Sequence, residues 1–145
     1  MMTDGKPVVP RWFLVAAIVA LLWNLLGFMA FYMQATMTPE AMGALPAEQQ
    51  RLFAERPWWV IWTLGGAVVA GVTGSLGLLL RKAWSLPVLA FSLAEVVAHH
   101  AYLFLLSDTF AVMGQKAMLM PLVVLAIAIG LVWLAFIARR KSWLA

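Results

Sequence analysis

Four apolar segments, each long enough to cross a lipid bilayer as a helix, constrain this chain more than any other feature. They span residues 12–33, 58–80, 83–107 and 119–138. The hydrocarbon core of a bilayer is about 30 Å thick, and a helix needs about 20 apolar residues to cross it. A strand or loop exposed to lipid would leave its backbone N–H and C=O groups without partners. The sequence therefore predicts an all-α, four-helix transmembrane bundle that forms a single integral membrane domain over residues 1–145.

The composition supports this class of protein and excludes several functions. Apolar residues make up 65% of the chain and charged residues 11%, whereas soluble domains have about 45–50% and about 25%. The chain contains no cysteine, which excludes disulfides, thiolate metal sites and cysteine nucleophiles. The net charge of +4 comes from basic residues at helix ends. We therefore expect the lipid bilayer to surround the chain, and we expect no nucleic-acid partner.

The distribution of basic residues predicts the orientation in the membrane. Cytoplasmic loops of membrane proteins carry an excess of Lys and Arg. Both termini are therefore expected in the cytoplasm, and the connection between the first two spans is expected outside. Seven basic residues fall on the predicted cytoplasmic side, namely Lys6, Arg11, Arg81, Lys82, Arg139, Arg140 and Lys141, against Arg51, Arg56 and Lys116 on the other side.

The outer connection between the first two spans has helix signals of its own. Residues 46–56 are predicted to form a short amphipathic helix that Pro57 ends. Leu52 and Phe53 could rest on the membrane surface while Glu48 and Glu55 face water. Two interpretations are open, a solvated connector and a lid over an outward-facing cavity.

The second span is rich in small residues at a spacing of four. Gly66, Ala70 and Gly74 form one stripe, and Gly71 lies in a second stripe beside it. Small residues let the backbones of membrane helices approach closely. The pattern predicts a helix-packing face, and its partner could be another helix of this chain or a second copy.

The third span carries polar residues where lipid-facing helices carry Leu and Val. On a helical wheel, Ser92, Glu95, His99 and Tyr102 lie near one face, and His100 points about 140° away from Glu95. Asn24 in the first span has a similar depth and is the expected partner of Glu95 or His99. These five residues, without His100, are the candidate proton or solute site.

Three interpretations of this polar cluster are possible. An ionisable residue inside a membrane is a functional-site hypothesis by default, and Glu95 and His99 could share one proton. The same residues could instead fix helix register as structural hydrogen bonds. A metal or haem site is the third interpretation. The chain has only two histidines, so we expect no metal and no cofactor.

The chain resembles a group of small four-helix bacterial inner-membrane proteins often labelled "sugar transporter". The resemblance covers most of the length and rests on "LLWNLLGFMAFYM" in the first span, on "RPWWVIWTLGGAVVAGVTGSLGLLLR" through the second, and on the last apolar hairpin with its basic tail. Asn24 falls in a shared motif, whereas Glu95, His99 and His100 match none. The resemblance implies a multi-pass protein of the bacterial inner membrane, and a transport role would require an oligomer because four helices are few.

These observations lead to a leading function and two alternatives. The leading function is translocation or proton-linked handling of a small solute by a homo-oligomer or a larger membrane complex. The first alternative is a non-catalytic accessory or assembly subunit that packs through the glycine-rich face of the second span. An integral-membrane enzyme comes last, because the sequence contains no G-x-S-x-G, H-E-x-x-H or P-loop motif.

Overall fold

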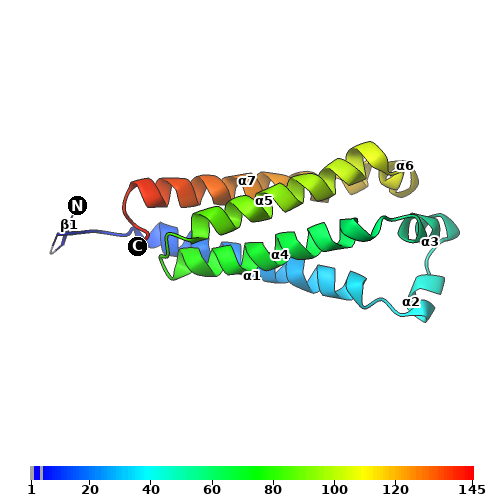
Figure 1. Cartoon of the computed structure of the whole chain (residues 1–145), viewed down its shortest axis with the longest axis horizontal. Coiled ribbons are helices and arrows are strands. Elements are labelled where there is room, and N and C mark those ends of the chain that lie inside the picture. The colour runs from blue at the N-terminus through cyan, green and yellow to red at the C-terminus, as the bar shows by residue number, and fades with distance from the viewer. Residues whose placement is uncertain (1, 4) are drawn as a thin grey trace.

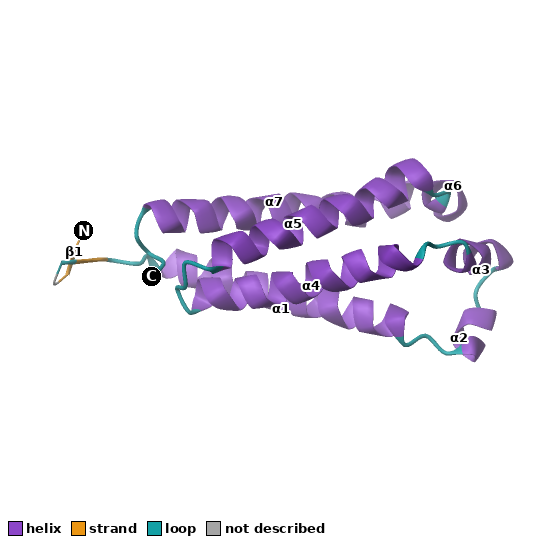
Figure 2. Cartoon of the chain, viewed as in Figure 1, coloured by secondary structure: helices purple, strands orange, loops and turns teal. Residues whose placement is uncertain are grey.

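Four long helices form the body of the computed structural model, which describes residues 2–3 and 5–145 (Figure 1). An additional π-helical turn, Tyr102–Leu106, extends the third of them, and a 3-10 turn, Gln115–Met118, precedes the fourth. Three short helices, loops and a small pair of strands make up the rest of the described chain (Figure 2). The long helices are α1 (Arg11–Ala35), α4 (Trp58–Leu79), α5 (Ser85–Ala101) and α7 (Leu119–Arg140).

The connections contain short elements. Near the N-terminus, β1 (Met2–Thr3) pairs with β2 (Lys6–Pro7) in antiparallel fashion. The connection between α1 and α4 contains α2 (Pro39–Gly43) and α3 (Ala47–Ala54), and α6 (Thr109–Met113) follows the π-helical turn.

Side chains fix the connection between α1 and α4. The hydroxyl oxygen of Thr38 accepts from the backbone N–H of Ala41 at 3.2 Å and so caps α2. Arg51 of α3 forms ion pairs with Glu48 at 3.1 Å and Glu55 at 3.0 Å, and it lies 3.7 Å from Asp108 beside α6. The contact with Asp108 links the two connections at this end of the bundle.

The four long helices have the length and apolar composition needed to cross a membrane. The candidate spans are Arg11–Ala35, Trp58–Leu79, Ser85–Leu106 and Gln115–Arg140. The prediction of an all-α chain with four membrane-spanning helices is therefore confirmed. The chain is a small multi-pass integral membrane protein.

The long helices pack in the order α1, α4, α5, α7 (Figure 1). Each packs along its neighbour in this row, whereas α1 and α7 make little direct contact. Both termini and the turn between α4 and α5 lie at one end of the molecule, called the terminal end here. Helices α2, α3 and α6 lie at the other end, called the loop end (Figure 1).

The C-terminal tail closes the terminal end. Ala145 accepts a backbone hydrogen bond from Ala83 at 2.8 Å and donates one to Arg81 at 2.7 Å. The Trp143 ring packs on Phe13 of α1, with ring centroids 5.5 Å apart. Because the same tail follows α7 directly, it holds α1 and α7 together at this end. The buried core gathers here and contains Phe13, Ala17, Leu78, Leu89, Leu134, Ala135, Ala138, Trp143 and Leu144.

Candidate functional site

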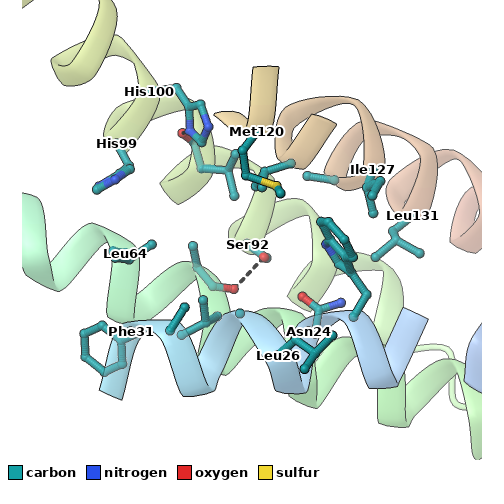
Figure 3. Close-up of a pocket in the computed structure, with 18 of the residues that line it drawn as sticks. Asn24, Leu26, Phe31, Leu64, Ser92, His99, His100, Met120, Ile127 and Leu131 are labelled. Carbon is teal, nitrogen blue, oxygen red and sulfur yellow. Dashed lines mark hydrogen bonds between the residues drawn. The ribbon is translucent and has the colours of Figure 1, made fainter. Parts of the chain in front are cut away.

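A cavity of about 420 Å³ lies between α1, α4, α5 and α7 (Figure 3). Its volume is within the range of ligand pockets, about 300–1,000 Å³. It lies on the loop-end side of the buried core, where the tail no longer brings α1 and α7 together. Most lining residues are apolar, and side chains able to hydrogen bond are contributed by Trp23, Asn24, Gln34, Ser92, His99 and His100.

Asn24 stands in the middle of α1 and bonds to α4 rather than to α5. Its amide nitrogen donates to the carbonyl oxygen of Ala20 at 2.9 Å and to the Ser75 hydroxyl oxygen at 3.0 Å. The expected hydrogen bond from Asn24 to Glu95 or His99 is therefore not formed. Asn24 nevertheless lines the cavity.

Helix α5 contributes three polar side chains to the cavity wall. Ser92, His99 and His100 are all buried, with 7%, 9% and 8% of their surface exposed. All three are among the residues that line the cavity (Figure 3). His100, which the helical wheel assigned to a different surface, thus belongs with His99 and Ser92.

Each of these three side chains is fixed by a backbone carbonyl oxygen. Ser92 donates its hydroxyl proton to Ala67 of α4 at 2.7 Å, the bond drawn in Figure 3. Nδ1 of His99 lies 3.2 Å from the carbonyl oxygen of Val60. Nδ1 of His100 lies 2.7 Å from the carbonyl oxygen of Val96, one turn earlier in the same helix. Ring orientation is therefore set by the fold and does not depend on a ligand.

Glu95 and Tyr102 lie outside this cavity. Glu95 is partly exposed, and its carboxyl group rests beside the backbone of α4 at Gly66. Among the described residues, no hydrogen bond reaches its carboxylate. Tyr102 packs edge-on against Trp59 of α4, with ring centroids 5.7 Å apart, and lines a smaller hollow near α3.

A helical wheel explains this division of the cluster. Relative to Glu95, His99 lies about 40° away, Ser92 about 60° and His100 about 140°, all in the same rotational sense. The cavity faces the middle of that arc, about 90° from Glu95. Glu95 and Tyr102 therefore turn toward α4, and the residues on the arc face the cavity.

The small residues of α4 pack against helices of this chain. A side chain at Gly71 would overlap Asn24 of α1, and one at Gly74 would meet Leu89 of α5 within 2.6 Å. Gly66 makes room for Glu95, and Ala70 is buried. The two stripes thus pack against α1 and α5 within the chain.

A basic residue stands at the loop end of the cavity. Nη1 of Arg56 donates to the amide oxygen of Gln34 at 3.3 Å, and its guanidinium lies 4.5 Å from the centre of the Phe53 ring. Burial lowers the pKa of the Arg56 guanidinium, and Tyr102 nearby opposes that shift. Arginine stays protonated in proteins, so a partly desolvated positive charge lies beside Gln34 at this end of the cavity.

Sequence reasoning missed the cavity, the role of His100 and the π-helical turn directly after the two histidines. Such turns within α-helices often occur at functional sites, and no signal in the sequence places one here. Within residues 2–3 and 5–145, no three His, Asp or Glu side chains gather closely enough to hold a metal ion. Comparisons with family models, with curated proteins and with solved structures find no match to this chain.

Proposed function

We propose that this protein binds a small, mostly apolar molecule inside the membrane, in the cavity between α1 and α7. One observation carries the proposal, a mostly apolar cavity of about 420 Å³ with preoriented polar side chains. The default binding-site hypothesis is the largest well-formed apolar pocket with a few convergent polar groups. Because α1 and α7 make little contact beside it, the molecule can enter from the surrounding lipid.

The lining favours an amphiphile over a free sugar. A sugar carries hydroxyl groups on all its faces, and each one buried without a partner would cost binding free energy. Much of the cavity wall is formed by apolar side chains such as Phe31, Val96 and Leu131. A resemblance to proteins labelled sugar transporters is compatible with a membrane carrier, and the cavity suits a more apolar cargo.

Carriage of the bound molecule across the membrane is the second candidate function. The observation that favours it is the asymmetry of the bundle, which is closed at the terminal end by the core around Phe13 and Trp143. Carriers alternate between states that are open on one side only. Flux of the identified molecule in proteoliposomes separates carriage from binding, since a binding protein alone would accelerate no flux.

We propose that the protein lies in the inner membrane of a bacterium, with its terminal end in the cytoplasm. The basic residues support this orientation, because seven of ten belong to the termini and the turn between α4 and α5. The cavity would then lie in the outer half of the bilayer, below α2 and α3.

We also propose that this protein associates with a second copy of itself in the membrane. Glu95 lies near the middle of the span Ser85–Leu106, is partly exposed, and accepts no hydrogen bond from the described residues. Ionisable residues inside membranes pair with one another or face a polar interior. A homo-oligomer in which the surfaces around Glu95 of two copies meet would supply that pairing.

A matched pair of variants tests binding in the cavity. Ala128 lines the cavity, whereas Ala126, two residues earlier on α7, is exposed outside it. Ala128→Phe should fill the cavity, and Ala126→Phe should only add surface. Protein purified in a mild detergent is extracted with organic solvent, and the extract is analysed by mass spectrometry. Wild type and Ala126→Phe should retain a small molecule that Ala128→Phe has lost. Equal retention by all three would exclude the cavity as the binding site.

A further inference from the structure

Four polar side chains that line the cavity use their N–H and O–H donors in hydrogen bonds within the protein. Both amide protons of Asn24 are engaged, one on Ala20 and one on Ser75. The hydroxyl proton of Ser92 is engaged on Ala67. None of these three protons is free to reach a ligand.

The two histidines are constrained in the same way. A carbonyl oxygen can only accept a hydrogen bond, so Nδ1 of His99 and Nδ1 of His100 must both carry a proton. In a neutral imidazole the other nitrogen is then an acceptor. Nε2 of each ring therefore presents a lone pair, and no described residue donates to it.

These side chains leave a set of unpaired acceptors, which we call the acceptor set: Asn24 Oδ1, Ser92 Oγ, His99 Nε2 and His100 Nε2. Two of them converge at α4, because a side chain at Gly71 would overlap Asn24 Oδ1 and lie 3.4 Å from Ser92 Oγ. The two rings lie side by side on α5, with centroids 5.8 Å apart. A ligand that fits this wall must bring protons to it.

Donors that line the cavity come from α1 alone. Trp23 has an indole N–H, and Gln34 has an amide whose oxygen is occupied by Arg56 at the loop end. No Asp, Glu, Lys or Arg side chain is part of the lining. Arg56 lies outside the lining and is engaged with Gln34 at the loop end, so an ionised ligand group at the side chains of α5 would be buried with no counter-charge in contact, which is strongly unfavourable.

We propose that the molecule bound in this cavity is an uncharged lipophilic alcohol or phenol, with its hydroxyl group directed at the histidines of the acceptor set. This inference rests on the proposed function and specifies its ligand class. The hydroxyl proton is donated to Nε2 of His99 or His100, and the apolar remainder packs against α7. An ether or ketone of the same shape cannot donate, so it leaves the same acceptors unpaired.

A pair of probes that differ only in the donor tests the proposal. 4-Nonylphenol has a hydroxyl proton, and 4-nonylanisole carries a methyl group in its place. Their dissociation constants are measured by titration calorimetry with the full-length protein in one mild detergent. Wild type should bind the phenol about two- to tenfold more tightly than the ether, the affinity that corresponds to one net hydrogen bond.

Variants show whether the preference comes from the histidines. His99→Phe combined with His100→Phe removes both Nε2 acceptors and keeps the ring volume, so its phenol-to-ether ratio should fall to about one. If the double variant does not fold, His100→Phe alone should lower the ratio, because its ring can keep the stack on Phe104. Thr73→Val is the control, since Thr73 is exposed on α4 and bonds only to its own helix. Micelle partition affects all variants alike and cancels in the comparison.

The outcomes separate the ligand class from the binding function. If wild type binds both probes with equal affinity, the cavity binds lipophiles and the donor requirement is wrong. If the ratio survives in a folded histidine variant, the acceptor set does not recognise the hydroxyl group. If neither probe binds to folded wild type and neither probe displaces the co-purified molecule, both the ligand class and the proposed binding function are overturned.

Discussion

Asn24 of α1 donates a hydrogen bond of 3.0 Å to the hydroxyl oxygen of Ser75 on α4, across two helices expected to lie in lipid. Ser75 is fully buried, and the bond is the polar link between these two helices near the middle of α1. Water cannot replace a lost partner there, so the bond should contribute to stability.

A double-mutant cycle measures that contribution. Asn24→Ala and Ser75→Ala should each lower the free energy of unfolding in detergent. The double variant should lose less than the sum, with a coupling of about 0.6 kcal/mol and at most about 1.7 kcal/mol, as found for hydrogen bonds between membrane helices. Additive losses would show that the two side chains do not interact in the folded protein.

Gly71 is required by the Asn24 side chain. A methyl group at Gly71 would overlap Asn24 Oδ1, so Gly71→Ala should destabilise the protein by about 1–3 kcal/mol, the usual cost of overpacking. In the Asn24→Ala background the same change should cost much less, because the overlapping atom is gone. The melting temperature of each variant in detergent gives the comparison.

Gly130 is the matched control for that experiment. It lies within α7, and a methyl group there would meet no atom within 4 Å. Gly130→Ala should therefore leave the melting temperature unchanged or raise it slightly, because alanine favours helix by up to about 1 kcal/mol. A loss at Gly130 equal to that at Gly71 would point to a general effect of the substitution rather than to contact with Asn24.

Trp143 of the tail should contribute strongly to stability at the terminal end. It is 7% exposed and packs against Phe13 and Trp12 of α1. Trp143→Ala should lower the free energy of unfolding by about 3–5 kcal/mol, typical for removal of a large buried aromatic side chain. Thermal unfolding followed by circular dichroism measures the change. Trp133→Ala is the control, since Trp133 is 65% exposed on α7 and should cost far less.

The number and type of the long helices could be predicted from the sequence because lipid leaves the backbone few choices. A long apolar segment must satisfy its hydrogen bonds internally, so length and composition decide the fold class. The small residues of α4 likewise indicated a packing face. Their partners could not be predicted, since Gly71 fits Asn24 of α1 and Gly74 fits Leu89 of α5 only in the assembled bundle.

The site was only partly predictable for a related reason. A helical wheel gives the angles between side chains of one helix, and it does not say which direction faces the neighbours. Helix α5 packs against α4 and α7, and this packing places Ser92, His99 and His100 in the cavity wall. Glu95, the centre of the predicted cluster, is left beside Gly66 of α4. The polar residues could be identified from the sequence. Which of them lie together could be known only once the helices were packed.

The orientation is tested by labelling, which the absence of cysteine makes simple. Single cysteines replace Ala47 in α3, Gln115 before α7 and Ser142 in the tail, and all three positions are exposed. An impermeant thiol reagent should reach Ala47→Cys and Gln115→Cys in intact spheroplasts. Ser142→Cys should react only after the membrane is opened. The reverse pattern would place the termini outside and the cavity in the inner half of the bilayer.

Glu95 provides the test of the homo-oligomer. If its carboxyl group pairs with a second copy, Glu95→Leu should shift the native mass in mild detergent from oligomer to monomer, because a leucine cannot hydrogen bond. Glu95→Gln replaces the carboxyl group with an amide that can still form hydrogen bonds, so it should preserve the oligomer. Thr73→Val, which removes a polar group that bonds only to its own helix, should also preserve it.

An unchanged native mass for folded Glu95→Leu would show that Glu95 does not hold copies together. A loss of flux in Glu95→Gln with native mass intact would instead support a role for its proton in carriage.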